Sequence, residues 1–563
     1  MRKLIIYLFA LISFTACNDE ILDVLPQDRV SDEAVWNDPN LITAYHTALY
    51  QSVLHGFNIH MQSKATDEAF NAINWDIGII PIGQLRADNV GSVSNTHWTG
   101  GGSLHYWNSA YQYIRRINIF LDQMQVNDIF VPNKERLVAE AKFLRGYIYF
   151  LLIERYGGVP IVSESYDLGA EEFFSRNTFD ECVEFIENDL SEAIPDLDQR
   201  YQSTDGNFGR ATKDAAQALR SRMFLYAASP LYNENNDRSK WQRAADAAEA
   251  LINSTYSLHP DYTTLFNQPM GSANNEMIFV RPFASSPGSF HQAPMHNLNR
   301  RYGAYGGWWA SNGPSQNLVD DYDMINGEPA FIMNNGVRTI NPVSGYDPQN
   351  PYANRDPRLD ATVIYDGAVY HGDLFEMWVA SDDESWGFDS YRQSGDNPRT
   401  NYVLRKFMPD DGTPLSWQQP YTNPWIIFRL GEIYLNYAEA KFELGDEATC
   451  REFLSRIRER VNMPPIPADL TGEELRRRLY NERRIELAFE EHRYWDVRRW
   501  KIATEVENAP IMGMNIIKNV NTGVKTYTPI KLLDRVFLER MYLLPIELNE
   551  TLRNPEIEQN PGY

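Results

Sequence analysis

Apolar residues recur at helical spacing through much of the chain. One stripe has members four or three positions apart, which places them on a single face of a helix: Leu137, Ala141, Leu144, Ile148 and Leu151. The stripe stops before Gly157-Gly158 and Pro160, residue types that commonly end a helix. The spacing therefore predicts a long amphipathic helix that finishes near residue 156.

The same pattern predicts further helices at 178–194, 215–226, 241–252, 433–444 and 453–461. Several are joined by short turns and carry small residues where two helices would touch. Pairs of this kind are typical of tetratricopeptide hairpins, although no strict repeat of about 34 residues is present. We predict a mostly α fold, with a tetratricopeptide-type helical-hairpin scaffold and long irregular loops.

The character of the chain changes between residues 255 and 425, where helical stripes disappear and Pro, Gly, Asn and aromatic residues become frequent. A second loop-rich stretch covers residues 71–102. Long loops on a rigid frame commonly hold binding residues. We predict an N-terminal helical region at 17–255 and a C-terminal region at 256–563, with a loop-rich ligand-binding insertion at 256–425.

The N-terminus has the features of a bacterial lipoprotein signal. A basic start at residues 1–3 precedes an uncharged apolar run at 4–12, which is too short to span a bilayer. Small residues then lead from Phe14 through Ala16 to Cys17. We predict a signal peptide at 1–16 and lipidation of Cys17, so that the protein is anchored to a membrane without spanning it.

The overall charge excludes some partners. The formal net charge is −24, and removal of residues 1–16 would leave 50 basic residues against 76 acidic ones. Such a surface repels nucleic-acid phosphates, so we expect no nucleic-acid partner. Beyond Cys17 only Cys182 and Cys450 remain, and no Cys/His cluster occurs. We expect no metal site and no cofactor, and the sequence leaves open whether the two cysteines pair.

Seven segments resemble the signature of the SusD/RagB family of Bacteroidota lipoproteins. They are AEAKFLRGY at 139–147, YGGVP at 156–160, RDPR at 355–358, RLGEIYLNYAEA at 429–440, NERRIELAFE at 481–490, HRYWDVRRW at 492–500 and QNPGY at 559–563. The resemblance implies a tetratricopeptide-based α fold, display on the outer-membrane surface and a SusC-like TonB-dependent porin as partner. It also implies delivery of oligosaccharides, or in some branches peptides, to that porin.

Three carboxylates near the C-terminus invite an enzymatic interpretation. Glu482, Glu486 and Glu490 recur every fourth residue on one helical face, and glycosidases use paired carboxylates. A general acid needs a raised pKa, whereas neighbouring guanidinium groups lower it. Such groups lie within reach at Arg483, Arg484 and Arg493. We therefore interpret this segment as an ion-pair network between helices and expect no catalytic residues.

Aromatic residues on glycine-rich loops are the candidates for ligand binding. A fixed indole or phenol ring can cover the apolar face of a sugar, while Asn, Asp and Arg side chains pair with its hydroxyl groups. The candidate ligand-binding residues are Trp308, Trp309, Tyr305, Trp98, Trp75, Asn74, Arg86 and Asp88. An ion pair that braces the loop is the alternative role for the last two. Trp107, Trp241, Trp495 and Trp500 lie within helical patterns, and we expect them in the core.

The leading hypothesis is a non-catalytic, surface-exposed glycan-binding lipoprotein of the outer membrane, which passes oligosaccharides or polysaccharides to a SusC-like porin. One alternative keeps the fold and replaces the glycan by a peptide or another nutrient, as in the RagB branch. A second alternative is a helical glycoside hydrolase.

Overall fold

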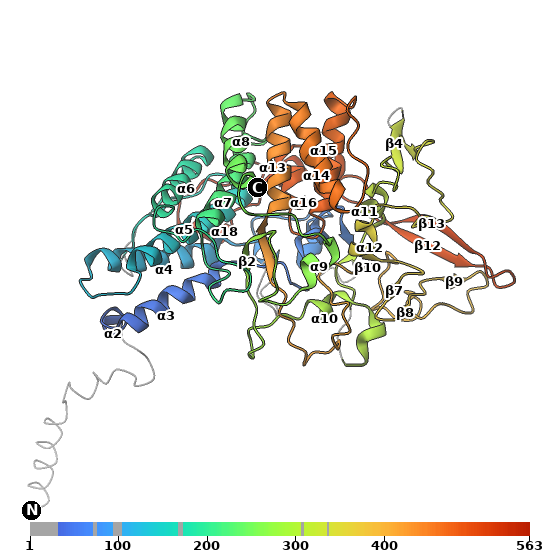
Figure 1. Ribbon diagram of the computed structural model, residues 1–563, viewed down its shortest axis with the longest axis horizontal. Coiled ribbons are helices and arrows are strands. Elements are labelled where there is room, and N and C mark those ends of the chain that lie inside the picture. The colour runs from blue at the N-terminus through green and yellow to red at the C-terminus, as the bar shows by residue number, and fades with distance from the viewer. Residues whose placement is uncertain (1–31, 71–75, 94–103, 167–172, 306–308, 335–336) are drawn as a thin grey trace, which may run out of the picture.

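A row of packed helices forms the frame of the molecule. The computed structural model describes residues 32–70, 76–93, 104–166, 173–305, 309–334 and 337–563, so the predicted signal peptide and Cys17 lie outside them. Each helix of the row packs against the next (Figure 1). The row consists of α4 (Trp107–Val126), α5 (Lys134–Tyr156), α6 (Phe179–Ala193), α7 (Lys213–Ala228), α8 (Arg238–Ile252), α13 (Leu430–Glu443), α14 (Glu447–Arg460) and α15 (Gly472–Glu486).

The helices predicted from apolar spacing are all present, from α5 through α8 and in α13 and α14. Local capping explains where several begin. Thr178 and Glu181 form a capping box at the start of α6, and Thr212 accepts a hydrogen bond from the Ala215 N–H at the start of α7. Gly157, with φ +73°, ends α5 as its pattern predicts. The prediction of a mostly helical fold is confirmed.

Residues 253–429 are inserted between α8 and α13, which are nonetheless in direct contact. The insertion is closed by two antiparallel strands, β2 (Met277–Arg281) and β11 (Trp425–Arg429), with Met277 opposite Arg429 and Arg281 opposite Trp425. Every residue of β11 is buried. The α-helices described in this insertion are short. The helix α9 (Tyr262–Asn267) precedes β2, and α10 (Ala293–Asn297), α11 (Gln316–Asp321) and α12 (Arg358–Thr362) lie between the two strands.

Several small sheets supplement the helices. The largest has the order β13-β12-β9, from β12 (Ile511–Lys518), its antiparallel partner β13 (Lys525–Leu533) and the parallel strand β9 (Val379–Ala380). The two-stranded pairs are β1 (Ala69–Phe70) with β3 (Gly313–Pro314), β4 (Phe331–Asn334) with β5 (Val337–Ile340), β6 (Val363–Ile364) with β10 (Val403–Leu404), and β7 (Val369–Tyr370) with β8 (Asp373–Leu374). The sequence patterns did not predict these strands.

The remaining helices are α2 (Asp32–Trp36), α3 (Pro39–Leu49), α16 (Arg493–Arg499), α17 (Ala503–Val506) and α18 (Leu548–Arg553). The four tryptophans expected in the core are all buried, with 2–6% of each side chain exposed. Cys182 and Cys450 are buried free thiols. Within the described ranges, no helix combines the length and the apolar character needed to cross a membrane.

Candidate functional site

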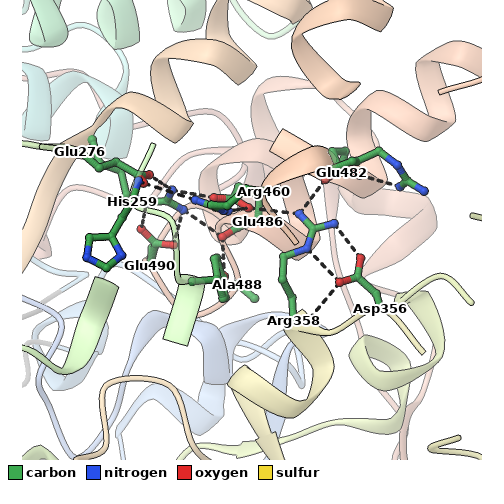
Figure 2. A network of polar contacts seen from close by, with 12 residues as sticks. His259, Glu276, Asp356, Arg358, Arg460, Glu482, Glu486, Ala488 and Glu490 are labelled. Atoms are coloured by element: carbon green, nitrogen blue, oxygen red, sulfur yellow. Dashed lines mark hydrogen bonds and ion pairs between the residues drawn. The ribbon is translucent and has the colours of Figure 1, made fainter. Parts of the chain in front are cut away.

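The three carboxylates that suggested catalysis lie in a buried ion-pair network (Figure 2). Glu486 accepts hydrogen bonds from Arg429 at 2.6 Å, from Arg358 at 3.1 Å and from Arg460 at 2.5 Å. Glu482 is bound by Arg358 and Arg458, and Glu490 by Arg429 and Lys406, all within 2.6–2.9 Å. The network connects α14 and α15 to β11 and α12.

The electrostatics of this network oppose acid catalysis. The guanidinium groups of Arg460, Arg429 and Arg358 outweigh the effect of burial and hold the pKa of Glu486 well below its ordinary value. Arg429 and Lys406 lower the pKa of Glu490 in the same way. A general acid must hold its proton near neutral pH, which these carboxylates do not. Their chemistry is that of structural anions.

The partners of these carboxylates differ from those expected. Arg483 pairs with Asp496 at 2.8 Å, and Arg484 and Arg493 both pair with Asp67. The carboxylates instead use cations from positions 358, 406, 429, 458 and 460. Neighbours in sequence were expected to pair, but the fold brings cations from four other segments to the glutamate-bearing side of α15.

The pairing of β1 with β3 brings two predicted loop regions together. Phe70 lies opposite Gly313 and Ala69 opposite Pro314. Residues 71–75, with Asn74 and Trp75, follow β1 directly, and Trp308 and Trp309 precede β3 by a few positions. We call this strand pair, which joins segments more than 200 positions apart, the β1–β3 junction.

Close backbone packing holds this junction. A Cβ atom on Gly313 would lie 3.1 Å from the Phe70 carbonyl oxygen and 3.2 Å from that of Tyr402, closer than side chains normally approach. The buried Asn312 accepts a hydrogen bond from the Met61 N–H at 3.0 Å, and its Nδ2 donates to Asn297 at 2.7 Å. The loop that precedes β3 is thereby attached to the segment that precedes β1.

Trp309 is partly exposed and packs on a buried histidine. Its ring centroid lies 6.3 Å from that of His296, with 19° between the planes, and Trp417 packs edge-on against the same His296 ring, with centroids 5.6 Å apart. Burial lowers the pKa of His296 to about 4, so this ring is neutral at physiological pH. Hydrogen bonds from Ala310 and Ser311 to the backbone of residues 298 and 296 fix the loop. The indole is thus presented on a rigid, uncharged support.

The structure describes only some of the other predicted binding residues. Trp75, Asn74, Trp98 and Trp308 lie outside the described residues, as does the side chain of Tyr305. Arg86 donates to Asp88 through Nε at 2.9 Å, and both side chains are more than half exposed. Their turn lies against the C-terminal segment, with Ala87 accepting from the Leu548 N–H. The ion pair lies within one turn, as the loop-brace alternative expects, and a role of the pair in ligand binding stays a prediction.

His296 and Trp417 were missing from the predicted site. His296 was considered only for its spacing from His291, which does not match one helical face. Trp417 lies in a loop more than 100 positions downstream, and its one signal in the sequence is an aromatic residue within the insertion. Both residues support Trp309 through the tertiary fold.

Two family models cover most of the chain: "SusD family" matches residues 275–563, and "Starch-binding associating with outer membrane" matches residues 20–225. The chain is 25% identical to SusD-like protein P25 of Formosa agariphila over 90% of this chain and 91% of that protein. It is 27% identical to the starch-binding protein SusD of Bacteroides thetaiotaomicron over 64% of each.

Solved structures agree over nearly the whole chain. A SusD-like protein from Bacteroides fragilis superposes with a TM-score of 0.77 at 27% identity, covering 96% of this chain and all of that one. A SusD-like carbohydrate-binding protein from the same species gives 0.75 at 26% identity, with 93% and 100% coverage. The family models, the relatives and the shared fold together establish that the chain belongs to the SusD family.

Proposed function

We propose that the protein is a non-catalytic glycan-binding lipoprotein of the outer-membrane surface, which delivers oligosaccharides to a SusC-like TonB-dependent transporter. The observation that carries the proposal is the partly exposed Trp309, which lies shortly before the β1–β3 junction in the chain and stacks on the buried His296 ring. A rigid indole suits the apolar face of a sugar ring. Relatives that are named as starch-binding and carbohydrate-binding support the ligand class.

Binding to a panel of glycans and peptides tests the ligand class. We expect saturable binding of at least one neutral polysaccharide, and Trp309→Ala should weaken it about fivefold to tenfold because one stacking surface is lost. Trp241→Phe is a matched control, since this tryptophan is buried within α8. Binding of peptides with no binding of glycans would contradict the proposal and favour the RagB-like alternative.

A hydrolysis assay on the same panel tests the absence of catalysis. We expect no turnover, since Glu486 and Glu490 are held ionised by buried cations. Turnover abolished by Glu486→Gln in a folded protein would overturn this assignment.

Membrane attachment and partnership are tested on the natural protein. Mass spectrometry of the mature N-terminus should show lipid on Cys17, and Cys17→Ser should release the protein from outer membranes. Gently solubilised membranes should yield the protein together with a SusC-like transporter. Recovery of the protein alone would argue against a stable complex.

A further inference from the structure

A hairpin within the insertion carries two exposed aromatic rings, neither of which belongs to the predicted site. The segment 376–389 folds back on itself through N–H···O bonds from Asp389 to Glu376, from Gly387 to Trp378 and from Ala380 to Ser385, at 2.8–2.9 Å. Trp386 lies directly opposite Val379. We call this segment the 376–389 hairpin. Through β9 it joins the sheet at one end of the molecule (Figure 1).

Trp386 and Phe388 lie on the same face of this hairpin. Side chains two positions apart on a strand point to the same side, with Cα atoms roughly 6.6 Å apart. Gly387 separates them, and a Cβ atom there would lie only 2.2 Å from the Glu376 carbonyl oxygen. Trp386 is 39% exposed and Phe388 is 50% exposed. The Trp-Gly-Phe order keeps the strands close, and both rings stay partly exposed on the face that also carries the buried Val379.

Each ring is held in place by a polar contact. The Trp386 Nε1 donates to the Gln393 Oε1 at 2.9 Å. The guanidinium of Arg301 covers one face of Phe388 at 4.8 Å, and Arg301 is itself bound twice by the fully buried Asp389. Neither ring packs against another aromatic ring among the described residues. Solvent-exposed rings held in fixed orientations lose little side-chain freedom when a ligand stacks on them.

Polar groups beside the rings suit hydroxyl-rich ligands. Asp382, Asp383 and Glu384 lie exposed at the tip of the hairpin and offer carboxylate acceptors. Asp383 is paired with Arg392, and the carboxylates of this tip can also accept hydrogen bonds from sugar hydroxyl groups. Rings flanked by acceptors match a pyranose, which has an apolar face and hydroxyl groups around its edge.

The hairpin forms an ion pair with a segment that precedes Trp309 in the chain. Arg301 belongs to the 3-10 helix η6 (Arg300–Tyr305), a few positions before Trp309, so its bonds to Asp389 tie that segment to the hairpin. Tyr302 of the same helix donates to the Tyr370 carbonyl oxygen at 3.0 Å in β7. These contacts attach η6 to the face of the hairpin that carries Phe388.

We infer that Trp386 and Phe388 form a second glycan-binding platform, which takes neutral oligosaccharide or polysaccharide chains by ring stacking. This inference rests on the proposed function and adds a second contact surface to it. A long chain engages the platform and the β1–β3 junction together, whereas a short oligosaccharide engages one of them. The platform thus selects for polymer length through an increase in effective concentration.

The test uses the full-length mature protein, with soluble starch, laminarin and other neutral polysaccharides as probes. Trp386→Ala and Phe388→Ala should each weaken binding of the polymer about fivefold to tenfold, and Trp386→Phe should weaken it less. Trp378→Phe is the matched control. Trp378 lies on the opposite face of the hairpin, with the Lys518 ammonium 4.1 Å from its ring. Its substitution should leave affinity unchanged.

A local readout separates the platform from the proposed function. Hydroxyl-radical footprinting should show that bound polysaccharide protects Trp386 from oxidation and leaves Trp378 unchanged. The platform alone is overturned if polymer binding is lost in Trp309→Ala but keeps wild-type affinity in Trp386→Ala and Phe388→Ala, and if bound polymer does not protect Trp386 in the wild type. No binding of any glycan by the wild type overturns both. If Trp386→Ala and Phe388→Ala keep the wild-type glycan affinity but no longer co-purify with a membrane protein, this face is a protein interface. That result also overturns the platform.

Discussion

The buried ion-pair network and the 376–389 hairpin use charged and aromatic side chains in opposite ways. In the network, Arg358, Arg429 and Glu486 are almost fully buried, and both arginines pair with Glu486. In the hairpin, Trp386 and Phe388 are held in place yet remain open to solvent. The difference separates two tasks: buried charges fix how the helices are arranged, and exposed rings are available for a ligand. Substitutions in the two regions should therefore affect different quantities.

The largest effect is expected in the buried network. Glu486→Gln removes the shared anion of Arg358, Arg429 and Arg460, and should lower the free energy of unfolding by about 3–5 kcal/mol because buried cations lose their partner. Chemical denaturation measures this. Glu473→Gln on the same helix is the control, since Glu473 is 72% exposed and its loss should change stability by less than about 0.5 kcal/mol. Equal effects of the two would contradict the distinction between buried and surface pairs.

Lowering the pH should reduce the difference in unfolding free energy between the wild type and Glu486→Gln. The pKa of Glu486 is depressed in the folded protein, so its contribution to stability is complete above its unfolded value of 4.5 and is lost as pH falls further. The difference in unfolding free energy should be constant from pH 7 to about pH 5 and shrink below that. A gap that widens on acidification would show that Glu486 is protonated in the native state.

A smaller effect is expected where two backbone segments touch. A Cβ atom on Gly158 would lie 2.0 Å from the Asn177 carbonyl oxygen, so Gly158→Ala should cost about 1–3 kcal/mol of stability. Gly206→Ala is the control, because nothing lies within 4 Å of the added carbon. Thermal unfolding of both variants measures the difference. If Gly158→Ala is as stable as the wild type, the backbone at Asn177 can move away from residue 158 without loss of folding free energy.

The smallest effect is expected at the exposed Arg86–Asp88 pair. Asp88→Asn should leave the unfolding midpoint and glycan affinity unchanged, because both side chains are open to solvent and screened by salt. Denaturation and binding titrations at two salt concentrations check this. A drop in affinity without a change in stability would assign the pair to ligand binding after all.

The helices could be predicted because their signals are local. Apolar spacing located α5 through α8, α13 and α14, and the Glu482-to-Glu490 series was recognised as part of an ion-pair network. The partners of those glutamates were not predictable, since Arg358, Lys406 and Arg429 reach them through the tertiary fold. The strands were missed because most contain only two to five residues, too few for an alternating pattern.

The candidate site could be predicted only in part for the same reason. Trp309 became a candidate through its loop composition, whereas its contact with His296, and that of His296 with Trp417, join distant segments. Trp386 and Phe388 were not predicted, because the Trp-Gly-Phe order is no recognisable local signal. Its role depends on the hairpin, in which the backbone of Glu376 packs against Gly387. Exposure is a property of the fold, and it is what separates a ring in the core from one that can meet a sugar.

The pairing of β2 with β11 has a consequence for how such proteins diversify. Because β2 and β11 are paired, the segment 282–424 leaves and re-enters the frame at one place. Lengthening a closed loop costs little entropy, so loops within this segment can lengthen while its entry and exit points stay fixed. A segment grafted from a relative must still supply the cations that Arg358 and Lys406 provide to the buried glutamates.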